Sequence, residues 1–238
     1  MMSKWWIAIG AVALAVVALF VYRNLTSGPR LDGTCRAIPT AAGVGDISVD
    51  TARGIAYLAY LDRTQDAEGK RPVGTVMLVD LNAHEPRVRA ALSSDPPDFR
   101  PMALSLYAPA QGARRLFVVD AGKEAFSIRV FEQSSTGAFS LVKLVRDSRL
   151  VNPTALVAAG PDQFYVVMQR AWWQFGTPPV AYYDGQRMTS VTADKAQEIA
   201  AATSLAKEHH ADAAAKAGKI VLIGSLTRHE LTLCESAN

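Results

Sequence analysis

The chain has 238 residues, of which half are hydrophobic and a fifth are charged, and its formal net charge is +3. This length suits one substantial domain, alone or with a tail. A net charge so close to zero, without any block of Lys and Arg, argues against a nucleic-acid-binding protein, and we expect no nucleic-acid partner.

An uncharged apolar segment, WWIAIGAVALAVVALFVY, covers residues 5–22 and has aromatic residues at both ends. About 20 such residues cross a bilayer, and aromatic side chains are typical of its interfaces. A cleavable signal peptide is the alternative, but its apolar region is usually about 7–15 residues and is followed by a small-residue cleavage site. No good site follows closely here. We therefore expect a transmembrane signal anchor over residues 1–23, in contact with the membrane through 5–22, and a polar linker over 24–34.

Two cysteines, Cys35 and Cys234, lie near the two ends of the remaining chain. Neither stands in a CxxC or Cys/His spacing, which argues against zinc. If they pair, the disulfide joins the ends of the domain and requires an oxidising compartment. That would make the chain a single-pass membrane protein with its domain in the periplasm or the extracellular space. Two unrelated buried thiols are the alternative.

Short strand signals, separated by Gly, Pro, Asp or Asn, fall into three groups of four, over residues 46–92, 102–147 and 153–192. Four-stranded units that repeat about every fifty residues are typical of the blades of a β-propeller. An ordinary β-sandwich would show the same alternation without the fourfold grouping. We predict an all-β propeller domain over residues 35–238, with four blades, or three and a partial one.

The fourth unit differs from the others. Residues 192–217 are rich in Ala, Glu and Lys and predict an inserted surface helix with Thr192 or Asp194 as its cap. Two strands follow, KIVLIGS and HELTLCES, and the second contains Cys234. An N-terminal strand that carries Cys35 can complete this unit, which is how propellers avoid an open edge.

Several segments, in order, resemble the paraoxonase/arylesterase family, within the gluconolactonase-like six-bladed calcium propellers. The resemblance covers roughly Cys35 to Met188 and Lys219 to Glu235. It is carried by CRAIPTAAGVGDI, GTVMLVDLN, FRPMALSLY, RRLFVVD, VNPTALVAAGPDQFYVV, AYYDGQRM and GKIVLIGSLTRHELTLCES. The N-terminal apolar segment and the two terminal cysteines are also similar to those of the animal paraoxonases.

The resemblance implies a central calcium ion, held by Glu and Asn/Asp side chains, and a pair of His residues that prepare water to attack a lactone or aryl ester. This sequence departs from that pattern. Gly45 stands at the Glu position, Met102 and Ala121 stand at the two His positions, and Thr154 and Ala155 replace an Asn-Asp pair. The family's further blades are replaced by the helix.

The residual candidates for a metal site are Asp46, Asp120 and Thr154. Calcium takes about 6–8 oxygen ligands, and these three residues supply too few. Met102 cannot accept a proton, and we interpret it as packing in a pocket that has lost its metal. We therefore expect no catalytic residue and no cofactor.

The preferred interpretation is a membrane-anchored, extracytoplasmic propeller that binds or scaffolds and does not catalyse. An incomplete ring can need a protein partner to cover its edge, so we expect a subunit of a membrane-associated assembly. Trp172 and Trp173, on a loop, either contact a membrane or partner or pack half-buried. The alternative function is a calcium-dependent arylesterase or lactonase that uses Asp46, Asp120 and Thr154.

Overall fold

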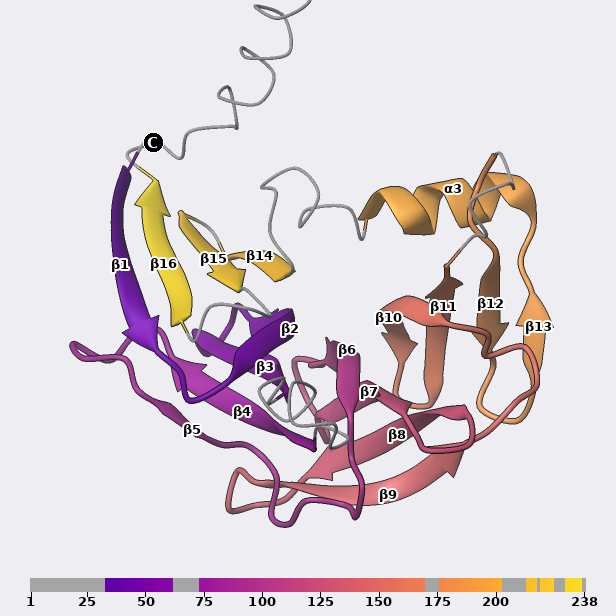
Figure 1. Ribbon diagram of the computed structural model, residues 1–238, viewed down its shortest axis with the longest axis horizontal. Helices are drawn as coiled ribbons and strands as arrows, with labels where there is room; N and C mark the ends of the chain where they lie inside the picture. Colours follow the sequence, from indigo (N-terminus) through magenta and orange to yellow (C-terminus); the bar gives the residue numbers. More distant parts are fainter. Residues whose placement is uncertain are drawn as a thin grey trace, which may run out of the picture. The chain divides into compact units, whose positions relative to one another are not determined.

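The computed structural model describes residues 33–61, 73–169, 176–202, 213–217, 219–224 and 230–236. This part of the chain forms four antiparallel sheets of four strands each and one helix, α3 (Figure 1). The prediction of an all-β domain with one inserted helix is therefore confirmed. The predicted anchor over residues 1–23 lies outside the described residues. Among the described residues, no helix is long and apolar enough to span a bilayer.

Three sheets are built from strands that follow one another in the chain, as the grouping in the sequence predicts. The first sheet contains β2 (Gly43–Asp50), β3 (Ile55–Leu61), β4 (Gly74–Asp80) and β5 (Val88–Ala90). The second sheet contains β6 (Pro101–Tyr107), β7 (Arg115–Ala121), β8 (Phe126–Gln133) and β9 (Phe139–Val145). The third sheet contains β10 (Pro153–Gly160), β11 (Gln163–Met168), β12 (Val180–Tyr183) and β13 (Met188–Ser190).

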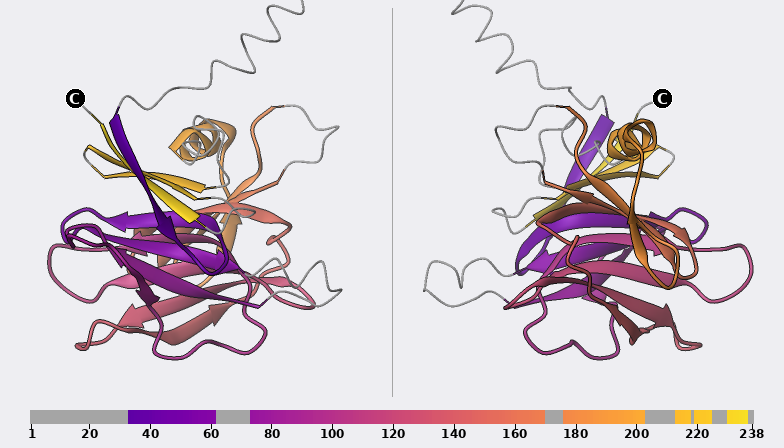
Figure 2. Two further views of the ribbon diagram at one scale, coloured as in Figure 1. Left: turned by 60° about the vertical axis from the view of Figure 1, so that its left-hand side comes forward. Right: turned by 90° about the vertical axis from the view of Figure 1, so that its right-hand side faces the viewer.

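The fourth sheet, called the terminal sheet here, joins the two ends of the domain. Its order is β1-β16-β15-β14, with bounds β1 (Gly33–Pro39), β14 (Ala213–Ala217), β15 (Ile220–Gly224) and β16 (Glu230–Ser236). Cys35 lies directly opposite Cys234 in the β1–β16 register, and the two form a disulfide. Figure 2 shows indigo β1 beside the yellow C-terminal strands in both views. The predicted pairing of the terminal cysteines is confirmed.

The helix predicted over residues 192–217 is too long. Helix α3 covers Ala193–Ala202, and Ala213–Ala217 forms strand β14, which pairs with β15 along its whole length. The AAAKA segment has a high intrinsic helix propensity, but propensity is a weak prior. Pairing with β15, together with packing of Ala215 against the core, favours the strand.

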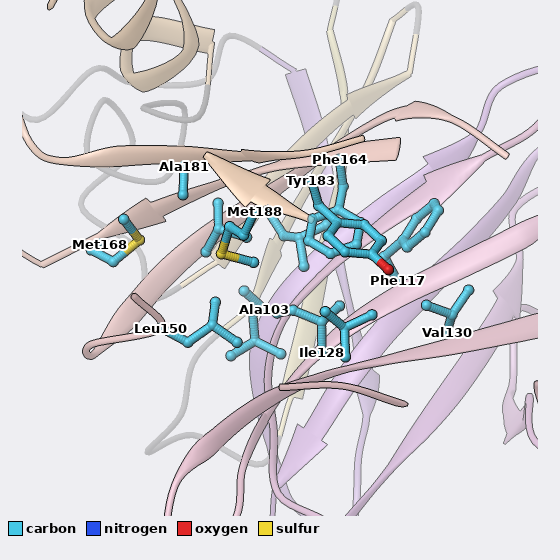
Figure 3. Packing of buried hydrophobic residues seen from close by; sticks show 14 residues of the cluster. Ala103, Phe117, Ile128, Val130, Leu150, Phe164, Met168, Ala181, Tyr183 and Met188 are labelled. Atoms are coloured by element: carbon cyan, nitrogen blue, oxygen red, sulfur yellow. The ribbon is translucent and has the colours of Figure 1, made fainter. Parts of the chain in front are cut away.

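The middle strands of the sheets have buried side chains on both faces. On β3, Leu58 packs into the cluster shared with the terminal sheet, and Tyr57 packs into the cluster shared with the second sheet. On β7, Val118 and Phe117 divide in the same way between the first and third sheets. Figure 3 shows the cluster between the second and third sheets, with Phe117 near residues of the third sheet such as Tyr183. The sequences of β3 and β7 are therefore continuous apolar runs, because both faces of these strands are covered by neighbouring sheets.

Helix α3 takes the place of a neighbouring sheet beside the third sheet. Phe164 of β11 packs toward the second sheet, whereas Tyr165 and Val167 pack in a cluster that contains Ala196 and Ile199 of α3. The first strands of the first three sheets contact each other in the order β2, β6, β10, and β14, the last strand in the order of the terminal sheet, contacts β2. In the part of the chain that the structure describes, no strand of the third sheet packs extensively against the terminal sheet.

The disulfide predicts a measurable effect on stability. It links residues 199 positions apart, and the entropy of closing so long a loop amounts to about 5 kcal/mol. We expect the Cys35→Ser/Cys234→Ser double variant to unfold at a clearly lower urea concentration than the wild type. Reductant should lower the midpoint of the wild type and leave that of the variant unchanged. Equal midpoints for the two proteins without reductant would contradict the expectation.

Candidate functional site

The candidate site is built on three bulged strands. The first strand of each of the first three sheets has a register shift near its start, between Val44 and Asp46, between Pro101 and Ala103, and between Pro153 and Ala155. The bulged residues are Gly45, Met102 and Thr154. The resemblance to the paraoxonase/arylesterase family places functional residues at these three positions. In the structure, all three occupy the same place, at the bulge near the start of the first strand of a sheet. Bulges are common next to active sites because they re-aim a side chain.

The side chains at these bulges offer little chemistry. Gly45 has no side chain. Met102 is half-buried and packs against the core cluster between the second and third sheets, which agrees with its interpretation as a packing residue. The Thr154 hydroxyl donates a hydrogen bond to the carbonyl oxygen of Val167 at 3.3 Å. None of the three provides a carboxylate or an imidazole.

Asp46 follows the first bulge and has both carboxylate oxygens engaged. Its Oδ1 accepts the N–H of Ile47 at 2.8 Å, and its Oδ2 accepts the N–H of Leu104 on β6, also at 2.8 Å. Burial raises the pKa of the Asp46 carboxyl from 3.8 to about 7, although the two N–H bonds act in the opposite direction. Asp46 thus connects the first strands of two sheets and carries only part of a charge at neutral pH.

Asp120, on β7, is buried and ion-paired. Its Oδ1 accepts the N–H of Arg100 at 2.9 Å, and its Oδ2 accepts Nε–H of Arg129 at 2.7 Å. The Arg129 guanidinium also lies 5.4 Å from the centre of the Phe99 ring. The next residue, Ala121, donates its N–H to the carbonyl of Arg100 and has no functional side chain. Asp120 is therefore a structural group that holds the start of β6 against β7 and β8.

The residues present do not fit a calcium ion. Asp46, Asp120 and Thr154 each make hydrogen bonds within the protein itself. Calcium needs about 6–8 oxygen ligands, and the guanidinium beside Asp120 would repel a cation there. Within the described ranges, no three His, Cys, Asp or Glu side chains are grouped as a metal site.

Most of the other candidate residues lie outside the described part of the chain. Trp172 and Trp173 lie outside the described residues, as do His209, His210 and His229. The remaining His84 is exposed in the loop between β4 and β5, where its carbonyl accepts a bond from Arg36 of the terminal sheet.

The basic partners of the buried carboxylates are not evident from the sequence. Arg129 pairs with Asp120, and Arg114 pairs with Asp50 at 2.9 Å, where the Asp50 side chain is 1% exposed. One signal was available, since an Asp at the end of an apolar strand needs a partner when it is buried. Which Arg supplies that partner depends on strand pairing, and the local pattern does not identify it.

The domain consists of four-stranded antiparallel sheets that contact each other through one edge strand each, and its last sheet combines strands from both chain ends. This arrangement defines a protein of the β-propeller class. A profile described as "Arylesterase" matches residues 66–237, which is well over half of the sequence. The chain therefore belongs to the arylesterase family.

A relative, "Serum paraoxonase/arylesterase 2" of Gallus gallus, is 24% identical over 206 residues, which cover 79% of this chain and 56% of that protein. The chain thus spans little more than half the length of this relative. A solved structure, "YCF48 bound to D1 peptide", shares 15% identity and a TM-score of 0.40, over 68% of this chain and 43% of that one. A likeness of that size carries no argument about this protein.

The raised pKa of Asp46 predicts a pH dependence of folding. The carboxyl titrates near 3.8 when the chain is unfolded and near 7 when it is folded, so the unfolded chain loses this proton first as the pH rises. The contribution of Asp46 to stability is therefore complete at the acid end and is lost as the pH rises to 7. We expect Asp46→Asn to flatten this slope in urea unfolding measured across the range. The exposed-site variant Glu85→Gln should keep the wild-type slope, and a wild-type slope in Asp46→Asn would contradict the assignment.

The ion pair of Asp120 and Arg129 predicts an asymmetric mutational effect. Both side chains are largely withdrawn from water, with 1% and 15% exposure, so Arg129→Met leaves a buried carboxylate without its cation. Such a change costs about 3–5 kcal/mol. We expect Asp120→Asn/Arg129→Met to recover part of this loss, because no unpaired charge remains. Urea unfolding of the wild type, of Arg129→Met and of the double variant measures both effects. An Arg129→Met variant as stable as the wild type would contradict the expectation.

Proposed function

We propose that this chain is a membrane-anchored, extracytoplasmic propeller that binds or scaffolds other molecules and does not catalyse ester hydrolysis. One observation carries the proposal: Asp46 and Asp120, the two carboxylates that remain at the site, have every oxygen engaged by N–H donors of the protein itself. Met102 and Ala121, at the family's two His positions, offer no group that could accept a proton from water. Among the described residues, these positions offer neither a histidine nor enough oxygens for a calcium ion, which supports the proposal.

The proposal includes the number of blades. The four sheets act as four blades, in place of the six in the propellers that the sequence resembles. Helix α3 supports this assignment because Ala196 and Ile199 are buried in the cluster on the free side of the third sheet. The face of the third sheet that α3 covers therefore cannot also pack against a following blade.

A calcium-dependent arylesterase or lactonase is the second candidate, and membership of the arylesterase family favours it. Under this alternative, Asp46 and Asp120 would have to give a metal ion the lone pairs that remain beside their present hydrogen bonds. Thr154 would have to turn its hydroxyl away from Val167. We prefer the non-catalytic function because these three residues supply fewer oxygens than the about 6–8 that calcium takes, and because neither of the family's His positions holds a histidine.

Hydrolysis of an aryl ester and of a lactone by the purified full-length chain distinguishes the two candidates. We expect no turnover above buffer with calcium or with a chelator, and no stoichiometric calcium in metal analysis of the pure protein. A family member with its Glu, Asn and His residues intact serves as the positive control. Chelator-sensitive turnover that disappears in Asp46→Ala would establish the enzyme instead.

The membrane anchor and the compartment belong to the same proposal. The uncharged residues 5–22 support an anchor, since they have the length and character of a membrane-spanning segment. The disulfide between Cys35 and Cys234 supports a domain in the periplasm or the extracellular space, because such bonds persist in oxidising compartments.

We also propose a protein partner, as a subunit of a membrane-associated assembly. Support comes from β9, the outer strand of the second sheet, where Leu141, Val142 and Leu144 are 44%, 51% and 41% exposed. An apolar edge strand left exposed to water is a site for pairing with another chain. Trp172 and Trp173 remain candidates for a membrane or partner contact on sequence grounds alone.

A further inference from the structure

The same side-chain bond repeats at two joints between neighbouring sheets. Ser48 on β2 accepts the N–H of Leu106 on β6 at 3.1 Å. Ser105 on β6 accepts the N–H of Ala158 on β10 at 2.9 Å. The two serines stand at the same distance from the bulge of their strands, and so do the two N–H groups that they accept. The joints are therefore equivalent, and a serine hydroxyl connects the first strands at each of them.

Asp46 adds a second bond at the first joint, through the N–H of Leu104. The position equivalent to Asp46 on β6 is Ala103, whose side chain has no acceptor atom. On β10, the position equivalent to the two serines is Val157, which packs in the cluster with α3. The serine is thus replaced by an apolar residue on the sheet whose next neighbour is a helix.

We infer that the first strands of the first three sheets are joined by side-chain acceptors, Asp46, Ser48 and Ser105, and not by a divalent cation. Strands β6 and β10 are edge strands, so their N–H groups that face the neighbouring sheet have no strand partner there. An N–H withdrawn from water needs an acceptor. A cation cannot supply one, because it takes up lone pairs in the same way as the N–H does. The carboxylate that the family's pattern keeps at Asp46 has therefore become a hydrogen-bond acceptor between strands.

The way in which the joints are held is independent of whether the protein hydrolyses esters. A protein without esterase activity could still need calcium to fold, and an active one could be stable without it. The joints are therefore tested by the effect of metal and of the joint residues on unfolding, whereas the proposed function is tested by turnover.

The experiment is thermal unfolding of the full-length chain after treatment with a chelator and after addition of calcium. We expect the same melting temperature in both conditions. Ser48→Ala and Ser105→Ala each leave an N–H without its acceptor, and each should lower the melting temperature by roughly 3–10 °C. The control Ser148→Ala, at an exposed position, should melt like the wild type. A higher melting temperature with calcium, or serine variants at the two joints that behave like the control, would overturn the inference.

Hydrogen exchange of the wild-type protein tests the same joints without any variant. The amide hydrogens of Leu104, Leu106 and Ala158 should exchange slowly and at rates that calcium does not change, since each is held by a side-chain oxygen. Fast exchange of these amides in chelator, slowed on addition of calcium, would show that the metal orders the joints and would overturn the inference.

Discussion

The first and second sheets of this protein have apolar side chains on both faces, which they can bury only against a neighbour on each side. The middle strands express this constraint directly, since alternate residues such as Tyr57 and Leu58 enter different core clusters. Removal of apolar surface from water on both faces is the main favourable term for such sheets. The ends of the series need special cover for the same reason. At the third sheet that cover is α3, which buries Ile199 against β11 and β12.

The stacking of the sheets also places the candidate site. Because the first strands lie side by side, a bulge at the start of each brings Gly45, Met102 and Thr154 to equivalent positions. Three positions that the sequence resemblance matches to functional residues of the arylesterase family thus occupy equivalent places in the fold. The side chains differ, and a fold positions functional groups without supplying them. The nearby carboxylates of Asp46 and Asp120 join strands to one another through hydrogen bonds.

The strand grouping was predictable because apolar runs and turn residues recur at a regular interval. The closing strand was predictable because Cys35 and Cys234 lie near the two ends of the domain. The helix boundary was not predictable in the same way. The segment Ala213–Ala217 has a helix-forming composition, and only the neighbouring β15 makes it a strand. The pairing of Asp120 with Arg129 was equally hidden, since it depends on the β7–β8 register and on burial.

The sequence by itself determined the strand units, the presence of one cysteine near each end of the domain, and the absence of oxygen or imidazole side chains at Gly45, Met102 and Ala121. These follow from residue type and spacing, which need no knowledge of distant contacts. Only the tertiary structure decided what Asp46 does. The N–H that its Oδ2 accepts belongs to Leu104, 58 residues further along the chain, and its raised pKa comes from burial. Hydrogen-bond partners and desolvation are properties of atoms brought together by folding, so no local pattern encodes them.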